Sequence, residues 1–131
     1  MFIDASAMIA IIVREEDGPA LGERAQQADR VFTSAVAVYE AVLGIARIRN
    51  ASVSGAEEVV NDFLREMRVE TIPITAEIGR GAIAAFGRYG RGQHPARLNM
   101  GDCFAYACSQ ALDVPLLFKG TDFSETDIAP A

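Results

Sequence analysis

The chain has 131 residues, of which 12 are basic and 18 are acidic, so its formal net charge is −6. Half of the residues are hydrophobic, which is enough for a buried core, but no apolar run approaches the ~20 residues that span a bilayer. We therefore expect a single domain over residues 1–131 without a membrane segment, and the net charge argues against non-specific binding of nucleic acids.

Short apolar runs alternate with stretches of helical periodicity in the first half of the chain. Serine favours the cap of a helix and proline fits its first turn, so these residues mark where helices begin. The expected elements are, in order, a strand at 2–3, a helix from Ser6 to about Arg14, a helix from Gly18-Pro19, a strand at 31–33 and a helix from Ser34 to about Arg49. In the last of these helices, Val36, Tyr39 and Leu43 recur at helical spacing.

The second half continues this alternation and contains two further local signals. Ser54-Gly55-Ala56-Glu57 has the pattern of a capping box, and Pro73 indicates either an edge strand or an early strand end. Ile78, Ala82, Ile83 and Phe86 are expected on the inward face of the helix that follows Thr75. The expected elements are a helix from Ser54, a strand at 69–74, a helix capped by Thr75, a glycine- and arginine-rich loop at 90–98, a helix capped by Asn99 and a strand at 114–118.

Strands separated by helices predict an α/β fold with a mainly parallel sheet of four to five strands and helices on both faces. Four acidic residues lie in apolar surroundings, where an isolated carboxylate costs roughly several kcal/mol unless it is paired or binds a metal. Asp4 and Asp122 follow expected strands, and Glu40 and Asp102 are expected in the first turns of helices. Because ligands bind beyond the carboxyl ends of parallel strands, this topology lets all four carboxylates converge there.

The chemistry of such a group is that of a hard metal ion. Clustered carboxylates repel one another when ionised, and oxygen ligands without histidine or cysteine suit Mg²⁺ or Mn²⁺. One use of this site is phosphodiester hydrolysis, in which the metal polarises the phosphate and lowers the pKa of a bound water. The metal also offsets repulsion between the acidic site and a polyanion, so the net charge does not exclude a nucleic-acid substrate.

Each acid also has an ordinary structural explanation, and the residues alone leave these explanations open. Asp102 could complete a helix cap, and Asp122 could belong to a turn. Glu40 could pair with Arg47 or lie at the surface of its helix. Asp4 is the hardest to explain in this way, because the end of a strand leaves it few structural duties.

Residues 78–101 contain no acidic residue but several basic ones. This strip could hold a phosphate backbone through Arg88, Arg91 and Arg97. A solvated helix face and loop explains the same arginines equally well.

The N-terminus has neither a basic segment nor an apolar segment of its own, so we expect no signal peptide and a cytosolic protein. Cys103 and Cys108 match no metal or redox spacing and are expected to be reduced core residues.

The four acids also lie in motifs that resemble a known family. The motifs are Met-Phe-Ile-Asp-Ala-Ser-Ala at 1–7, Thr-Ser-Ala-x-x-x-Tyr-Glu at 33–40, Leu-Asn-x-Gly-Asp-Cys-Phe-Ala-Tyr at 98–106 and Leu-Phe-Lys-Gly-Thr-Asp-Phe at 117–123. Over essentially the whole chain the sequence resembles a PIN domain, and most of all the VapC-like ribonuclease toxins of prokaryotic toxin–antitoxin pairs. The resemblance implies an α/β/α sandwich and magnesium- or manganese-dependent endonucleolytic cleavage of RNA. It also implies Asp4, Glu40, Asp102 and Asp122 as the metal site.

The resemblance carries further expectations about supporting residues and partners. It implies Ser6 as a supporting hydroxyl beside Asp4, and Thr121 as a small polar residue behind the metal ligands. It implies a VapB-like antitoxin that blocks the site, and commonly a homodimer. Apolar helix faces beyond a monomer's needs would suit such partners, although the core could take all of them.

Other functional classes compete with this interpretation. A non-catalytic PIN-fold RNA-binding or interaction module would keep the fold without needing all four acids. An enzyme that forms an aspartyl-phosphate at Asp4 is disfavoured, because Asp4-Ala5-Ser6 lacks the second aspartate of a dehalogenase-type phosphatase. A Ser–His–Asp hydrolase is also disfavoured, because His94 is the only histidine and no Gly-x-Ser-x-Gly motif exists.

Overall fold

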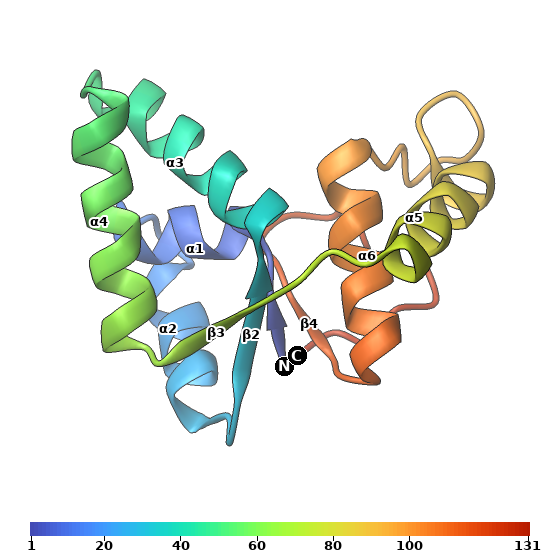
Figure 1. Cartoon of the computed structure of the whole chain (residues 1–131), viewed down its shortest axis with the longest axis horizontal. Helices are drawn as coiled ribbons and strands as arrows, with labels where there is room; N and C mark the ends of the chain where they lie inside the picture. The colour runs from blue at the N-terminus through green and yellow to red at the C-terminus, as the bar shows by residue number, and fades with distance from the viewer.

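The computed structural model describes residues 1–131, with four strands and two helices between each strand and the next (Figure 1). The first half comprises β1 (Phe2–Ile3), α1 (Ala5–Ile12), α2 (Gly18–Gln27), β2 (Val31–Ser34) and α3 (Ala35–Arg49). The second half comprises α4 (Val53–Glu66), β3 (Val69–Ile72), α5 (Ala76–Tyr89), α6 (Met100–Leu112) and β4 (Leu116–Leu117). None of the helices combines the length and the apolar character that crossing a membrane requires.

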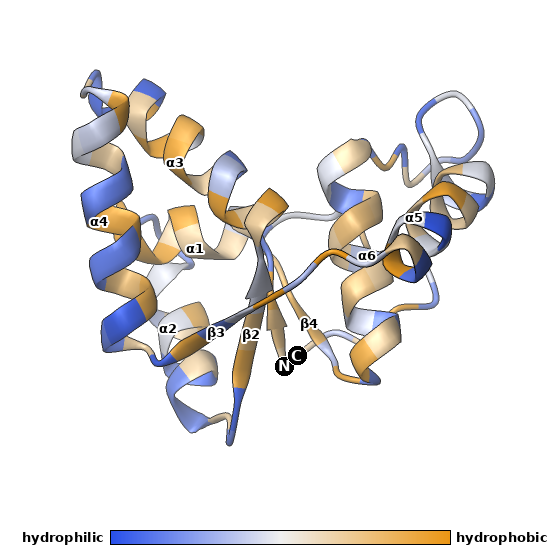
Figure 2. Ribbon diagram, in the orientation of Figure 1, coloured by the Kyte–Doolittle hydropathy of each residue, from blue (hydrophilic) through white to orange (hydrophobic).

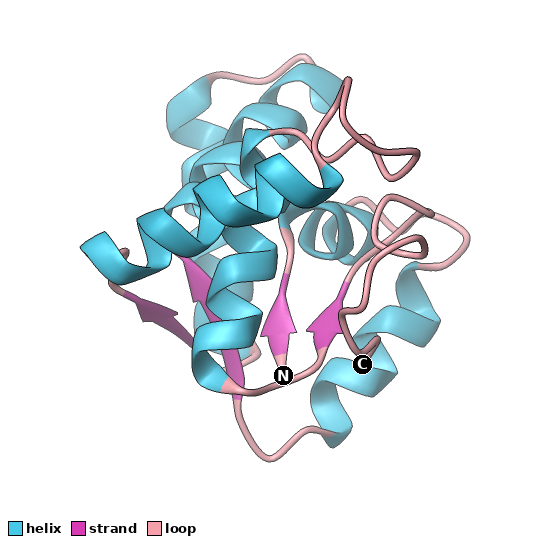
Figure 3. Cartoon of the chain, turned by 90° about the vertical axis from the view of Figure 1, so that its right-hand side faces the viewer, coloured by secondary structure: helices cyan, strands magenta, loops and turns pink.

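The four strands form one parallel sheet in the order β3-β2-β1-β4 (Figure 3). Phe2 of β1 is in register with Phe32 of β2 and with Leu116 of β4. β3 lies at an edge, in agreement with Pro73 directly after it, because proline cannot donate to a neighbouring strand. The end of the chain returns to β4, where Pro130 forms a single parallel bridge with Leu116. The predicted parallel sheet is therefore confirmed.

The alternation of side chains along each strand divides the core into two layers. Phe2 and Leu116 pack into the cluster beneath α5 and α6, whereas their neighbours Ile3 and Leu117 pack into the cluster beneath α1–α4. Figure 1 shows these two groups of helices on opposite sides of the sheet. The outer helices are amphipathic, and α4 alternates between hydrophilic and hydrophobic segments (Figure 2). The predicted α/β/α sandwich is confirmed.

Three of the expected helix caps are present. Ser34, Thr75 and Asn99 each accept a hydrogen bond from a backbone N–H in the first turn of the helix that follows. Each of these residues has the extended backbone that a capping position requires. The starts of α3, α5 and α6 were therefore predictable from single residues.

Two expected caps are wrong by two residues. α1 is capped by Asp4, and Ser6 is already inside the helix, which ends at Ile12 rather than near Arg14. α4 begins after Ser52, whose Oγ accepts the N–H of Gly55 at 3.0 Å, rather than at the Ser54 box. In both cases the earlier residue has the extended backbone that capping needs, and the sequence pattern does not reveal this.

Ile78 and Ala82 of α5 are buried as expected, but several of the large apolar residues of α3 and α5 are exposed. Tyr39 and Leu43 of α3 are 61% and 40% exposed, and Ile83 and Phe86 of α5 are 74% and 43% exposed. The residues that do face the core include many small ones, namely Ala37, Ala41 and Gly44 on α3 and Ala82 and Ala85 on α5. Small side chains let a helix approach its neighbours closely, so the larger apolar residues remain on its flank.

The strand order creates a topological switch point between β1 and β4. From β1 the chain proceeds outward to β2 and β3, and it then crosses back to add β4 on the other side of β1. In open parallel sheets, ligands bind at the carboxyl ends of strands that meet in this way. Asp4 follows β1 and the loop that carries Asp122 follows β4, so both lie at this point.

Candidate functional site

Asp4 lies at the carboxyl end of β1 and is only 5% exposed. Its Oδ2 atom accepts hydrogen bonds from the backbone N–H of Ser6 at 3.0 Å and from the Ser6 hydroxyl at 2.6 Å. Burial raises the pKa of Asp4 against the lowering effect of these hydrogen bonds, and the charge of Asp122 raises it as well. Asp4 therefore caps α1 and also brings a carboxylate to the switch point, so the expectation that it has few structural duties was wrong.

Ser6 connects Asp4 to the loop on the other side of the switch point. Its hydroxyl donates to Asp4, and the same oxygen accepts the backbone N–H of Lys119 at 3.0 Å. The ammonium group of Lys119 pairs with Glu15, just beyond the end of α1. Ser6 thus lies beside Asp4, where the resemblance to the PIN domain placed it.

Glu40 lies in the second turn of α3, one turn later than expected. Its half-buried carboxylate lies against Gly101 in the first turn of α6. Burial, together with the charges of Asp4 and Asp102, raises the pKa of Glu40 to about 7. Glu40 forms no ion pair with Arg47; the four ion pairs of the structure involve other residues.

Asp102 is the third residue of α6 and belongs to a capping box. Its Oδ2 accepts the N–H of Asn99 at 2.9 Å, and its own N–H donates to Oδ1 of Asn99 at 2.9 Å. Burial raises the pKa of Asp102 to about 6, and the charges of Asp4 and Asp122 raise it while the Asn99 hydrogen bond lowers it. The capping role is therefore present, and it also holds this carboxylate beside the other acids.

Asp122 and Thr121 lie exposed on the loop after β4, and neither side chain forms a hydrogen bond within the protein. Both residues line the same cleft as Asp102. The charge of Asp122 raises the pKa of both Asp4 and Asp102, so it is close enough to interact with each. The structure thus brings all four predicted acids together at the carboxyl edge of the sheet.

Two of the three predicted arginines lie at this site. Arg91 and Arg97, on the loop that joins α5 to α6, line a cleft of about 560 Å³ together with Asp102 and Asp122. Arg88 lies elsewhere, because its guanidinium group pairs with Asp127 at 3.1 Å. The cleft is therefore lined by both basic and acidic side chains.

A family model described as the PIN domain matches residues 1–129. The chain belongs to the PIN domain family. The resemblance in the sequence motifs is thereby confirmed, and it extends over nearly the whole chain.

Relatives of this PIN domain carry specific names. A VapC ribonuclease of Rhizobium meliloti (strain 1021) is 34% identical, over 97% of this chain and 98% of its own length. Ribonuclease VapC30 of Mycobacterium tuberculosis (strain ATCC 25618 / H37Rv) is 36% identical, over 98% of this chain and 96% of its own.

Two solved structures share the fold. The crystal structure of Mycobacterium tuberculosis VapC20, described as a sarcin-ricin loop cleaving toxin, has a TM-score of 0.76 at 17% identity and covers 99% of this chain and 97% of its own. A toxin–antitoxin complex from Klebsiella pneumoniae has a TM-score of 0.71 at 16% identity and covers 96% of this chain and 92% of its own. At these identities the two structures support the fold alone.

The candidate metal ligands of this PIN domain are all carboxylates. No group of three or more acidic, histidine or cysteine side chains is close enough to form a complete metal-binding cluster. The oxygen-only chemistry nevertheless suits Mg²⁺ or Mn²⁺, because Mg²⁺ keeps several waters and needs few carboxylates. Burial, and after it the charges of neighbouring acids, raises the pKa values of Asp4, Glu40 and Asp102, and a bound cation would stabilise their ionised forms. The residues therefore fit a hard cation that keeps part of its hydration.

Two contributions to the site were missed from the sequence. Gly101 provides the space that the Glu40 carboxylate occupies, and Lys119 holds Ser6 through its backbone N–H. A signal existed for each, since Gly101 is a glycine inside the first turn of a helix and Lys119 is the only lysine of the chain. Neither signal indicates the partner, which comes from a distant part of the sequence.

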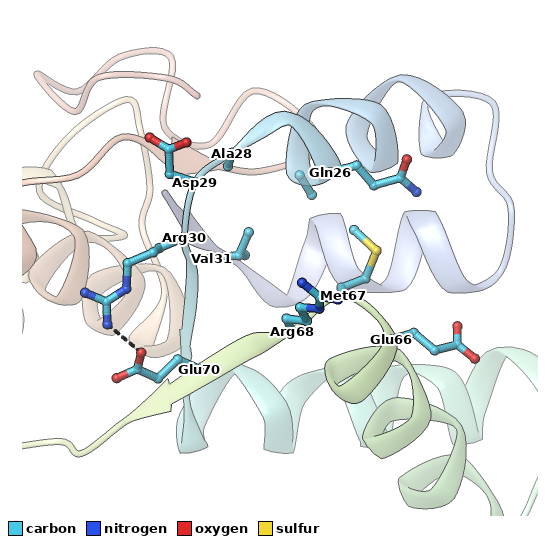
Figure 4. Close-up of a pocket in the computed structure, with 10 residues that line it drawn as sticks. Gln26, Ala28, Asp29, Arg30, Val31, Glu66, Met67, Arg68 and Glu70 are labelled. Atoms are coloured by element: carbon cyan, nitrogen blue, oxygen red, sulfur yellow. Dashed lines mark hydrogen bonds and ion pairs between the residues drawn. The ribbon is translucent and has the colours of Figure 1, made fainter.

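A second hollow lies at the opposite, amino-terminal edge of β2 and β3 (Figure 4). It has a volume of about 450 Å³ and lies between the end of α2 and the end of α4. Arg30 and Glu70 pair beside it at 2.7 Å. It contains none of the four acids, so the candidate site is confined to the carboxyl edge.

Proposed function

We propose that this PIN-domain protein is a metal-dependent endoribonuclease and the toxin of a toxin–antitoxin pair. The convergence of Asp4, Glu40, Asp102 and Asp122 carries the proposal, because four carboxylates from separate segments have no common structural purpose. Relatives named VapC ribonucleases support the reaction class, and the structural likeness to a toxin–antitoxin complex supports the biological role. The cofactor we infer is Mg²⁺ or Mn²⁺.

The four carboxylates would hold the cation at the switch point. When bound, the metal polarises the phosphodiester and lowers the pKa of the water that attacks it. The Ser6 hydroxyl keeps Oδ2 of Asp4 oriented, and the capping box does the same for Asp102. The pKa of Glu40 is about 7, so near neutral pH a part of its carboxyl groups carries a proton, which would be released when a cation binds.

RNA is the inferred substrate, and the cleft explains how an acidic protein would bind it. Arg91 and Arg97 line the same cleft as Asp122 and would contact backbone phosphates. Thr121 lines this cleft as well, where its exposed hydroxyl would bond the substrate. The arginines offset the repulsion that the carboxylates exert on the RNA.

A VapB-like antitoxin and a second copy of the chain are the inferred protein partners. The core does not absorb all the apolar residues, because several large ones remain exposed in two grooves. One groove of about 520 Å³ lies between α5 and α6, and the other, of about 440 Å³, lies between α3 and α4. Exposed apolar grooves of this kind suit partner helices.

Three predictions from the sequence stay predictions. They are the single domain over residues 1–131, the cytosolic location, and the alternative of a non-catalytic RNA-binding or interaction module. The lack of a complete metal cluster favours that alternative, and the presence of all four acids favours the nuclease.

Cleavage of a structured RNA by wild type and by Asp4→Asn, with Mn²⁺ and then with EDTA, tests the proposal. Asparagine is as good a helix cap as aspartate, so Asp4→Asn should keep α1 and lose the charge. Asp113→Asn, at the far end of α6, is the matched control. We expect cleavage only by wild type and the control, and only with metal. Cleavage that survives both Asp4→Asn and chelation would overturn the metal-nuclease proposal.

A further inference from the structure

Asp127, in the segment after β4, accepts hydrogen bonds from two different helices. Its Oδ1 accepts the Tyr106 hydroxyl of α6 at 2.6 Å, and its Oδ2 accepts Nη1 of Arg88 from α5 at 3.1 Å. The Arg88 guanidinium also lies over the ring of Tyr89, 4.8 Å from its centre. Asp127 therefore connects the C-terminal segment to both α5 and α6.

The contact between Tyr106 and Asp127 has a fixed position relative to Asp102 and Asp122. Tyr106 lies four residues after Asp102 on α6, so the two side chains share one face of that helix, one turn apart. Asp127 lies five residues after Asp122 in the segment that crosses this face. Asp122 interacts electrostatically with Asp102 at one end of the segment, and Asp127 bonds Tyr106 at the other.

The segment between these two points is held rigidly. Phe123 is buried and packs on Phe118, with 5.0 Å between the ring centres. The Thr126 hydroxyl donates to the Phe123 carbonyl at 2.7 Å and accepts the N–H of Ile128 at 3.3 Å. A stiff turn of this kind transmits a shift at one end to the other, so the position of Asp127 affects that of Asp122.

The Tyr106–Asp127 contact is a charge-assisted hydrogen bond. The bond from Tyr106 is the main cause that lowers the pKa of Asp127. Burial is the main cause that raises the pKa of Tyr106, and Asp127 raises it further, so the hydroxyl keeps its proton. Asp127 lies outside the cleft lined by Asp102 and Asp122, and the metal site proposed above does not use it.

We propose that Asp127 is a positioning residue, which through Tyr106 and Arg88 sets Asp122 opposite Asp102 for metal binding. The inference rests on the proposed metal-dependent function. It also gives Arg88 a role that differs from contact with RNA, because its guanidinium group is engaged by Asp127.

Tyr106→Phe and Asp127→Asn test this positioning, alone and combined. Tyr106→Phe removes only the hydroxyl and keeps the ring that packs on Tyr89, 5.7 Å away. Asp113→Asn is the matched control, because it neutralises an exposed aspartate of α6 with no contact to the site. Measured quantities are the Mn²⁺ dissociation constant by calorimetry, kcat and KM for RNA cleavage, and amide exchange of residues 121–128.

We expect each single variant to weaken Mn²⁺ binding and lower kcat about threefold to tenfold, the effect of losing one hydrogen bond to a charged group. KM should stay near the wild-type value, because Arg91 and Arg97, which are expected to bind the RNA, are unchanged. The double variant should be no worse than Asp127→Asn alone, since that substitution already weakens the contact with Tyr106. Exchange in residues 121–128 should become faster, and the Asp113→Asn control should change none of these values.

The two ways of failing are distinguishable. If wild type binds Mn²⁺ and cleaves RNA but the variants match it in Mn²⁺ affinity and kcat, the positioning role is overturned and the proposed function stands. If wild type neither binds Mn²⁺ nor cleaves RNA, the proposed function fails, and the positioning role for a metal site fails with it. Amide exchange then still reports whether Asp127 holds the segment.

Discussion

The carboxylate of Glu40 on α3 lies where the side chain of residue 101 on α6 would begin, and that residue is Gly101. A Cβ atom placed on Gly101 would overlap both carboxylate oxygens of Glu40. The glycine therefore lets an acid from the second turn of one helix reach the first turn of another. Without this space, Glu40 could not share a site with Asp102.

Gly101→Ala should displace Glu40 and weaken the site while the fold persists. Alanine is favoured over glycine inside a helix by about 1 kcal/mol, so α6 itself should not suffer. We expect at least about tenfold weaker Mn²⁺ binding, measured by calorimetry, from the loss of a carboxylate ligand or its shift. Gly87→Ala on α5 is the control, because its Cβ would meet open space. Equal Mn²⁺ affinities in both variants would contradict the role of Gly101.

Ser6→Ala should loosen the connection between Asp4 and the loop after β4. The substitution removes the hydroxyl that donates to Asp4 at 2.6 Å and accepts from Lys119 at 3.0 Å. Leaving these partners unsatisfied should cost about 1–3 kcal/mol in the free energy of unfolding. Denaturant titration measures this loss, with Ser54→Ala at an exposed position of α4 as the control. A cost as small as that of the control would show that water replaces the hydroxyl without penalty.

Without a metal ion, stability should fall as the pH rises towards neutrality. The pKa of Glu40 is raised from 4.5 to about 7, and that of Asp102 from 3.8 to about 6. Within these intervals the folded protein holds protons that the unfolded chain has released. The contribution to stability is therefore fully present below about pH 4 and is lost as the pH rises through about 7. Thermal unfolding in EDTA between about pH 5 and 8 measures this dependence.

Glu40→Gln provides the matched variant for this pH dependence, because it removes one titrating group. The fall in melting temperature between about pH 5 and 7 should become shallower in this variant. Saturating Mn²⁺ should also suppress the fall in wild type, since the cation stabilises the ionised carboxylates. A wild-type melting temperature that rises with pH over this interval in EDTA would contradict the raised pKa values.

The arginines should separate into two groups by their effect on RNA binding. Replacing Arg91 and Arg97 with alanine removes two expected phosphate contacts. The slope of log RNA affinity against log salt concentration should therefore become shallower by about 1 to 2. Arg88→Ala should leave this slope unchanged, because Arg88 pairs with Asp127 outside the cleft. Binding titrations at several salt concentrations measure both. If replacing all three arginines leaves the affinity and its slope unchanged, the basic strip is only a solvated surface.

Much of the fold followed from local chemistry. Ser34, Thr75 and Asn99 marked the starts of three helices. Each cap depends only on nearby residues, because the side-chain oxygen accepts the N–H of the residue three positions later. The parallel sheet followed from strands separated by helices, since parallel neighbours need a crossover. Exposure was harder to predict. Tyr39 and Ile83 belong to the apolar faces of their helices and are nevertheless exposed. The sequence pattern does not determine how much of such a face the neighbouring elements cover.

By itself, the sequence determined which acids are unusual and that Asp102 lies in the first turn of its helix. The cost of placing a carboxylate in an apolar run depends only on nearby residues, and so does the capping role of Asp102. Only the tertiary structure decided which groups meet. β4 lies beside β1, Glu40 lies against Gly101 and Arg88 is paired with Asp127. These contacts join residues far apart in the chain, and packing of the whole fold selects them.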